Sequence, residues 1–338
     1  MKAKVSHATV RLVPTAAVFL LVSCGGGAGG GGGPAPGTSP ASTPAALTAA
    51  NAQPVTDDVL NMSLSFISVG GSSSAGAGVV PLSAQFRKTR PRTRLLFGVL
   101  RQHIGVLSEP SAQTGPFVPA AAQPPIDCDV APDGTTGQII TDPEATSTTV
   151  TFNNCFSGGE TIRGMVAVTN IASPSAGNVS GHVSHNLTIV QSGFPTLTSS
   201  GEFDISHVTS GSVVTDTLSN GTITVRLDSD VASISGFSIV STVDTSNGAL
   251  TDSISGTIAS TLIGGAVTVA TPTAFQTAPT AQFPNTGQLV ITGAANSTVR
   301  FTVLGDESLG SNQVRLEVDP EGDGTFQAPP VETTWALL

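Results

Sequence analysis

The chain has 338 residues, with 13 Lys and Arg against 23 Asp and Glu, no Tyr and one Trp. A net charge of −10 argues against a nucleic-acid binder, because such proteins neutralise phosphates with Lys and Arg. The charged fraction of 11% is also too small for a coiled coil. Since 39% of the residues are hydrophobic, the chain has enough apolar material for a folded core.

The first 23 residues have the pattern of an export signal. Three basic residues precede the apolar stretch 12–22, which is too short to span a membrane. The junction LVSC at 21–24 resembles the lipobox of bacterial lipoproteins, whose cysteine becomes the acylated N-terminus. The resemblance implies that Cys24 carries the acyl chains, palmitate among them. Gly25 stands where enteric-type inner-membrane lipoproteins have Asp, so the resemblance implies sorting to the outer membrane. An ordinary cleaved signal with a chance cysteine is the alternative.

A low-complexity tether follows the signal, over residues 24–50. It contains the run GGGAGGGGG and then four prolines among Ala, Ser and Thr. A flexible chain of this length has an end-to-end distance of roughly 30 Å, so we expect the folded part to stand off the membrane surface. Removing residues 1–23 discards three of the 13 basic residues and no acidic ones, which leaves ten against 23 and a net charge of −13.

The remaining cysteines predict a disulfide. With Cys24 acylated, Cys128 and Cys155 are an even pair in an oxidising compartment. Closing this loop would stabilise the fold by about 3 to 4 kcal/mol on a chain-entropy argument. A two-thiol metal or redox site is the alternative, but it would require C-x-x-C spacing or accompanying His ligands.

Residues 51–110 are expected to be a helical segment. Asn51 can cap a first helix, in which apolar residues recur at intervals of four and three: Val55, Val59, Met62, Phe66 and Val69. A second helix is expected over 93–107, with His103 packed on its apolar face rather than acting as a ligand. Six of the ten basic residues of the mature chain lie between Arg87 and Arg101. They form either a patch for anionic lipid headgroups or a counterpart that neutralises the acidic body.

Residues 111–275 are expected to form a large curved antiparallel β-meander, open or nearly closed, covered by one or two N-terminal helices. From about residue 138 to 270 the hydrophobic period is two, most clearly at 149–152, 166–169, 183–190, 201–205, 221–227 and 234–240. Glycines recurring every 15 to 20 residues predict bulges or bends: Gly164, Gly181, Gly201, Gly221, Gly236 and Gly256. A β-solenoid is the alternative.

The tail at 284–338 is expected to form a small C-terminal β-unit, with strands over 287–293, 297–303 and 313–318. The turn that follows approximates the start of an EF-hand-type calcium loop: Asp319, Glu321 and Asp323 alternate before Gly324. It departs from that motif, because position three is Glu and position twelve is Pro330. A calcium site is one hypothesis and an acidic β-turn is the other; no other cofactor is expected.

The sequence has no recognisable catalytic constellation. His182 and His185 are three residues apart in a predicted strand, so they point to opposite faces and cannot readily share a metal. Only His207, on a neighbouring strand, could complete a ligand set. A G-x-S-x-G nucleophile elbow, a P-loop and a dinucleotide-binding glycine motif before a helix are all missing from the sequence. We therefore predict that the protein is not an enzyme.

Several short motifs together resemble a loosely defined set of uncharacterised proteobacterial lipoproteins. They are the lipobox followed by poly-Gly, LTAANA at 47–52, TFNNC at 151–155, GDGTF at 322–326 and TWAL at 334–337. The resemblance implies a cell outer membrane location, on the periplasmic face or at the cell surface, and it assigns no activity.

These observations predict a non-enzymatic, lipid-anchored cell-envelope protein. Its β-sheet is expected to bind a hydrophobic ligand, a lipid or an envelope protein, and no nucleic acid. A surface-displayed structural or adhesive module is the alternative, favoured by the richness in Ser, Thr and Gly. An envelope hydrolase is the third hypothesis.

Overall fold

The computed structural model describes residues 40–70, 124–144, 146–157, 159–175, 178–279, 281, 283–305 and 313–335. Four predictions lie outside these residues: the signal segment, the acylation of Cys24, the second helix at 93–107 with His103, and the basic segment Arg87–Arg101.

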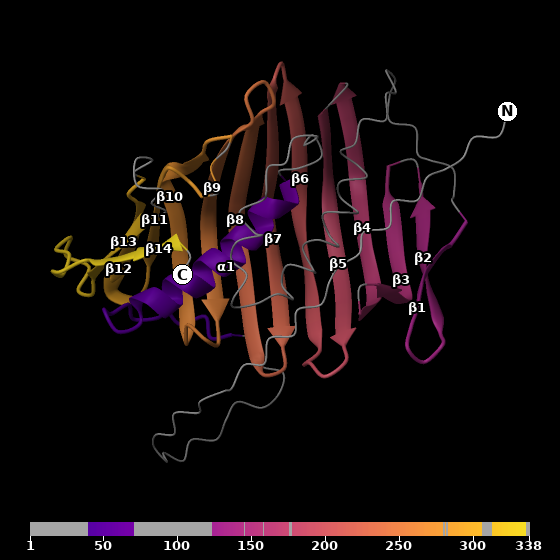
Figure 1. The fold of residues 1–338 in the computed structure, drawn as a ribbon, viewed down its shortest axis with the longest axis horizontal. Helices are drawn as coiled ribbons and strands as arrows, with labels where there is room; N and C mark the ends of the chain where they lie inside the picture. Colours follow the sequence, from indigo (N-terminus) through magenta and orange to yellow (C-terminus); the bar gives the residue numbers. More distant parts are fainter. Residues whose placement is uncertain are drawn as a thin grey trace, which may run out of the picture. The chain divides into compact units, whose positions relative to one another are not determined.

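Fourteen strands form one antiparallel sheet in which strands adjacent in the sequence are adjacent in space (Figure 1). Within the described residues β1 and β14 do not pair with each other, so the sheet is open. The predicted antiparallel meander is confirmed, and of the two predicted forms the open one is found. The strands are β1 (Ile126–Val130), β2 (Thr136–Pro143), β3 (Thr148–Ser157), β4 (Glu160–Ser175), β5 (Asn178–Gln191), β6 (Leu197–Ser210), β7 (Val213–Leu227), β8 (Asp230–Asp244), β9 (Ala249–Ser260), β10 (Gly265–Thr277), β11 (Thr286–Thr292), β12 (Thr298–Val303), β13 (Gln313–Asp319) and β14 (Val331–Thr334).

The last four strands, which lie in the predicted small C-terminal β-unit, continue the same sheet as the meander. β11 pairs with β10 as the next antiparallel strand. The connection between them is closed by hydrogen bonds, because the Asn285 amide donates to the Gln276 carbonyl at 2.7 Å and the Asn285 side chain accepts from the Ala278 amide at 2.9 Å. These hydrogen bonds join the end of β10 to the residues that precede β11.

Helix α1 (Ala52–Gly70) begins directly after Asn51, as predicted. The Asn51 side chain, however, binds the preceding segment: its oxygen accepts from the Thr48 amide and its nitrogen donates to the Ala46 carbonyl, both at 2.8 Å. Asn51 therefore fixes the direction in which the chain enters the helix.

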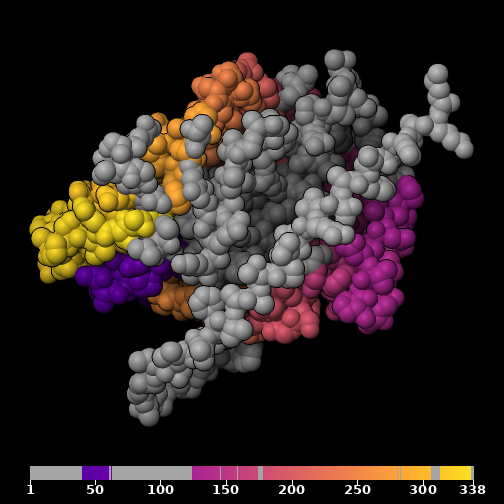
Figure 2. All heavy atoms as spheres, in the orientation of Figure 1, coloured from indigo at the N-terminus to yellow at the C-terminus, as the bar shows by residue number. Residues whose placement is uncertain are grey.

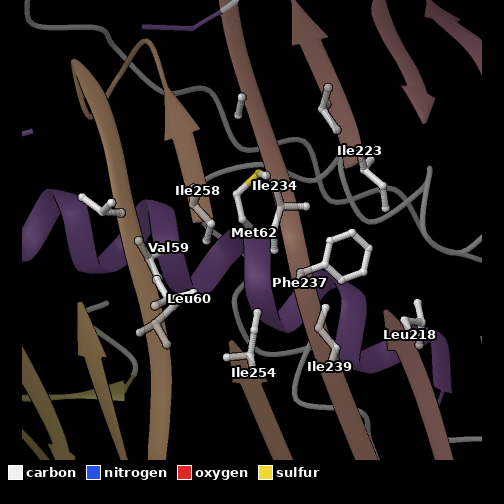
Figure 3. Close-up of a cluster of buried hydrophobic side chains, with 14 of the residues drawn as sticks. Val59, Leu60, Met62, Leu218, Ile223, Ile234, Phe237, Ile239, Ile254 and Ile258 are labelled. Carbon is white, nitrogen blue, oxygen red and sulfur yellow. The ribbon is translucent and has the colours of Figure 1, made fainter. Parts of the chain in front are cut away.

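α1 crosses one face of the sheet and packs against β7, β8, β9, β12 and β13 (Figure 1). We call this face the inner face and the opposite one the outer face. Three members of the predicted apolar stripe, Val55, Val59 and Met62, are buried. Figure 3 shows the side chains of α1 among aliphatic and aromatic side chains of the sheet. Each such aliphatic side chain contributes about 1.5 to 3 kcal/mol when fully buried.

The end of the predicted tether is part of the fold. The amide of Ala45 donates to the Ala266 carbonyl at 2.9 Å, and the Ala45 carbonyl accepts from the Ala294 amide at 2.7 Å. Leu47 is buried. The prediction that residues 24–50 are all tether is therefore wrong for this C-terminal part, because backbone hydrogen bonds and an apolar anchor fix it to the sheet.

A line of irregularities crosses the central strands where the glycines predicted them. Asn220 and Gly221 of β7 lie opposite Phe203 alone, and the register of β8 shifts next to Gly236. A Cβ on Gly221 would lie 2.0 Å from the Glu202 carbonyl oxygen, and Gly236 has φ +54°. Glycine is required at the first position by close approach and favoured at the second by backbone conformation.

An aromatic cluster closes the C-terminal end of the core. The ring of Trp335 lies 5.0 Å from that of Phe301 and 6.2 Å from that of Phe275, centroid to centroid, and stacks on Phe283. Figure 2 shows the α1 atoms next to those of the C-terminal strands. The tail thereby joins the core that α1 covers.

Candidate functional site

Regular pairing arranges the side chains of the central strands in cross-strand rows. Partners in register lie side by side on the same face of the sheet. Most inner rows are apolar: one contains Ile205, Leu218, Ile239 and Ile254 on β6 to β9. These rows form the core beneath α1.

One inner row is polar, and we call it the polar row: His207, Asp216, Ser241 and Asp252. Each residue is the direct register partner of the next, on β6, β7, β8 and β9. Phe275 of β10 ends the row. Four polar side chains in line on an apolar face are the strongest candidate for a functional site in this fold.

Burial increases along the polar row. His207 and Asp216 each have 13% of the side chain exposed, and the His207 Nδ1 lies 2.6 Å from the Asp216 Oδ1. Ser241 is 3% exposed and Asp252 is fully buried. One end of the row is therefore close to solvent, and the other lies inside the core.

Asp252 is the unusual member of the row. Neither of its carboxylate oxygens has a hydrogen-bond partner of good geometry among the described residues. Burial raises the pKa of Asp252 to about 7, and the neighbouring Ser241 hydroxyl opposes this rise only in part. Desolvation penalises the charged form of an unpaired carboxylate, which is the direction expected here.

Carboxylates lie on the inner side of the sheet, both on its strands and on α1. α1 adds Asp57 and Asp58, and the pKa of Asp57 is raised to about 6, first by burial and second by the charge of Asp58. All four arginines of the described strands lie at outer-face positions: Arg163, Arg226, Arg300 and Arg315. Among the described residues the inner face therefore has carboxylates and no Lys or Arg.

The histidines confirm the face prediction. His185 points inward and its Nε2 lies 2.8 Å from the Ser199 Oγ, whereas His182 points outward and its Nδ1 lies 2.8 Å from the Asp204 Oδ1. His207 joins neither of them. Within the described part of the chain no three His, Cys, Asp or Glu side chains gather as a metal site would require.

His185 and Ser199 form a hydroxyl–imidazole pair but a poor catalytic one. Both are buried, and desolvation lowers the pKa of His185 to about 4. So weak a base would accept the serine proton poorly at neutral pH. The His185 Nδ1 also has no hydrogen-bond partner among the described residues, so no acid orients the ring. In the polar row, Asp216 separates the histidine from Ser241 and a triad order does not arise.

In the acidic turn, backbone amides of the turn itself donate hydrogen bonds to Asp319 and Asp323. Asp319 is buried, and its two oxygens accept from the Gly322 amide at 2.8 Å and the Gly324 amide at 2.7 Å. The Asp323 carboxylate accepts from the Thr325 amide, and Glu321 is exposed. The structure does not bring these three carboxylates together, and backbone amides occupy the oxygens of Asp319.

The predicted disulfide is confirmed: Cys128 and Cys155 are bonded. The bond joins β1 to β3, and Asp129 pairs with Phe156 beside it. The first hairpin is thus folded back onto the next strand at this edge of the sheet.

The outer face has a different chemistry. Its central rows consist largely of Ser and Thr: one contains Ser219, Ser238 and Ser255, and the next Thr222, Ser235 and Thr257. The sheet therefore has an apolar inner face with one polar row and a hydroxyl-rich outer face.

The polar row was not predicted from the sequence. Its members at 207, 216, 241 and 252 follow no periodic spacing, because each separation depends on the length of a hairpin. The available signal was that His207 lies two residues after the apolar Ile205 in a predicted strand. This spacing places both side chains on the same face, but it does not predict which residues of the other strands lie beside His207.

No family of known proteins matches this chain, and neither a curated protein nor a solved structure matches it. None of the described helices combines the length and apolar character needed to cross a membrane.

Proposed function

We propose that the protein is a lipid-anchored component of the cell envelope, held in the outer membrane through Cys24. Its sheet binds an apolar ligand on the inner face and performs no catalysis. The lipobox-like junction at 21–24 supports the anchor, and the low basicity of His185 speaks against the hydrolase hypothesis.

The extent of the inner face carries the proposal. α1 packs mainly against β7 to β9 and against β12 and β13. Apolar inner-facing side chains continue on β3 to β6, beyond those strands: Phe152, Val166, Val183, Leu187 and Phe203. These side chains are at most 3% exposed, so the apolar core of the inner face is larger than the part that α1 contacts. An extended apolar face of this kind supports the proposal of an apolar ligand.

Binding is tested with the fluorescent apolar probe N-phenyl-1-naphthylamine and the purified full chain. Ile205→Asn places a polar amide on the half-buried part of the inner face, and we expect it to weaken probe binding several-fold. Val208→Asn, on the outer face of the same strand, is the matched control and should bind like the wild type. Absence of probe binding by the wild type would refute the proposal.

The anchor is tested by fractionation of cells that express the full chain. Cys24→Ala should move the protein from the membrane fraction to the soluble fraction. A variant that stays membrane-bound would show that another feature holds it there.

A surface-displayed adhesive module is the second candidate, and the Ser- and Thr-rich outer face favours it. Protease treatment of intact cells separates the two candidates. Cleavage without permeabilisation supports display at the surface, and protection supports a periplasmic binding protein.

A further inference from the structure

We propose that the hairpin turns at one end of the sheet rest in the headgroup region of a phospholipid bilayer, into which Val130, Phe194 and Leu262 insert. This inference rests on the proposed lipid anchor at Cys24. It adds a second contact with the membrane and gives the sheet an orientation on it.

The topology gathers every second turn at the same end of the sheet. In an antiparallel meander each strand reverses the direction of the one before it, so the turns after β1, β3, β5, β7 and β9 lie together. Figure 1 shows these turns along the lower end of the sheet. We call this end the tether end, and the turns after β2, β4, β6 and β8 lie at the opposite end.

The three most exposed large hydrophobic side chains of the described residues all lie at the tether end. Val130 is the last residue of β1 and is 64% exposed. Phe194 lies in the turn after β5 and is 59% exposed, and Leu262 lies in the turn after β9 and is 57% exposed. Aliphatic and aromatic side chains of this kind bury their apolar area at the boundary between headgroups and acyl chains.

The opposite end has a different composition. Its turns, at 144–147, 176–177, 211–212 and 245–248, consist of Ala, Gly, Ser, Thr, Asn and Glu. None of these residues is a large hydrophobic one. The two ends of the same hairpins therefore differ in the property that a bilayer would recognise.

The tether joins the fold at the tether end. The Thr43 carbonyl accepts a hydrogen bond from the Ala266 amide at 2.9 Å. Ala266 is the second residue of β10, which begins at Gly265 directly after the turn that contains Leu262. The chain from Cys24 thus reaches the sheet beside that turn, so an acyl anchor at Cys24 is attached to the fold at the end where the exposed apolar side chains lie.

The charge at the tether end selects the type of lipid. Its five turns, at 131–135, 158–159, 192–196, 228–229 and 261–264, contain two Asp and no Lys or Arg. Both carboxylates, those of Asp133 and Asp228, belong to exposed residues. An anionic lipid surface attracts basic segments and repels acidic ones, so a zwitterionic bilayer is the matching surface.

The test uses tryptophan as a reporter of lipid contact. The full chain, purified from membranes, is reconstituted into phosphatidylcholine vesicles with or without a phosphatidylcholine brominated in its acyl chains. Trp335 is 2% exposed and is present in every variant, so the wild type gives the background signal. We expect bromine to lower the added fluorescence of Phe194→Trp and of Leu262→Trp about two-fold, because both turns reach the boundary of the acyl chains.

Val213→Trp is the matched control. Val213 is also an exposed hydrophobic residue beside a hairpin turn, but it follows the turn after β6, at the opposite end. Its added fluorescence should not respond to bromine. Replacing half of the lipid by phosphatidylglycerol should reduce the quenching of Phe194→Trp, and an increase would overturn the choice of a zwitterionic surface.

Flotation of the vesicles, measured on the same samples, separates the two proposals. A chain that floats with the vesicles while Phe194→Trp and Leu262→Trp are not quenched would overturn the membrane contact and leave the anchor at Cys24 standing. Equal quenching of Val213→Trp would overturn the orientation, because both ends would then touch lipid. A chain that does not float would refute both the anchor and the contact.

Discussion

The two faces of the sheet are built from the same strands and follow different physical rules. Ile205, Leu218, Ile239 and Ile254 form an inner row, and their sequence neighbours Ser206, Thr217, Val240 and Ser253 form the adjacent outer row. Leu218, Ile239 and Ile254 are at most 4% exposed, whereas the four outer side chains are partly exposed. Stability should therefore depend strongly on the inner residues and weakly on the outer ones.

Two aspartates extend this comparison to charge. Asp252 on the inner face has a raised pKa because of burial. Asp204 on the outer face has a lowered pKa, chiefly because it accepts a hydrogen bond from His182. An aspartate therefore contributes to stability with opposite pH dependence on the two faces.

The largest effect is expected from the core. Phe237→Ala removes a ring that is 2% exposed and packs near Phe203, so we expect a loss of about 3 to 5 kcal/mol in the free energy of unfolding. Ser238→Ala, on the outer face next to it, should cost about 0.5 kcal/mol or less. Urea unfolding of both variants measures the two losses in the free energy of unfolding. Equal losses would contradict the expected difference between the two faces.

The next effect concerns Asp252 and pH. Its folded-state pKa of about 7 exceeds the unfolded value of 3.8, so its contribution to stability declines as pH rises from about 4 to 7. Relative to the wild type, Asp252→Asn should gain up to about 4 kcal/mol over this range. Chemical unfolding at several pH values gives the difference between the two proteins, and a difference independent of pH would contradict the expected burial.

A smaller effect is expected at the line of bulges that crosses the central strands. Gly221→Ala would place a Cβ 2.0 Å from the Glu202 carbonyl oxygen, and we expect a loss of about 3 kcal/mol from local overpacking. The control is Gly211→Ala, where no atom lies within 4 Å and only the positive φ is unfavourable, at a cost of about 1 kcal/mol. Thermal unfolding distinguishes the two, and similar losses would show that the backbone yields at Gly221.

The smallest effect belongs to the outer face. Asp204 is 45% exposed, so after allowance for solvent screening Asp204→Asn should cost about 0.5 kcal/mol or less. Because its pKa is lowered, the small contribution is present above the unfolded value of 3.8 and disappears as pH falls below it. A loss above about 1 kcal/mol at pH 7 would show that outer-face hydrogen bonds contribute strongly to stability, against the expected difference between the two faces.

The strand boundaries show how far periodicity predicts this fold. The strands predicted at 287–293, 297–303 and 313–318 agree with β11, β12 and β13 to within one residue. The stretches 221–227 and 234–240, however, cover only about half of β7 and β8. The bulges shift the alternation: in β7 the buried residues change from Leu218 to Ile223 and Val225, so a single period of two does not describe the whole strand.

The sequence by itself determined the elements of local origin: the strands through their alternation, the bends through their glycines, α1 through its apolar stripe and the disulfide through its two cysteines. Only the tertiary structure decided that His207, Asp216, Ser241 and Asp252 lie in one row and that β11 continues the sheet. Local patterns assign a residue to a face. Its neighbours on that face depend on hairpin lengths, bulges and register, which are properties of paired strands rather than of any one segment.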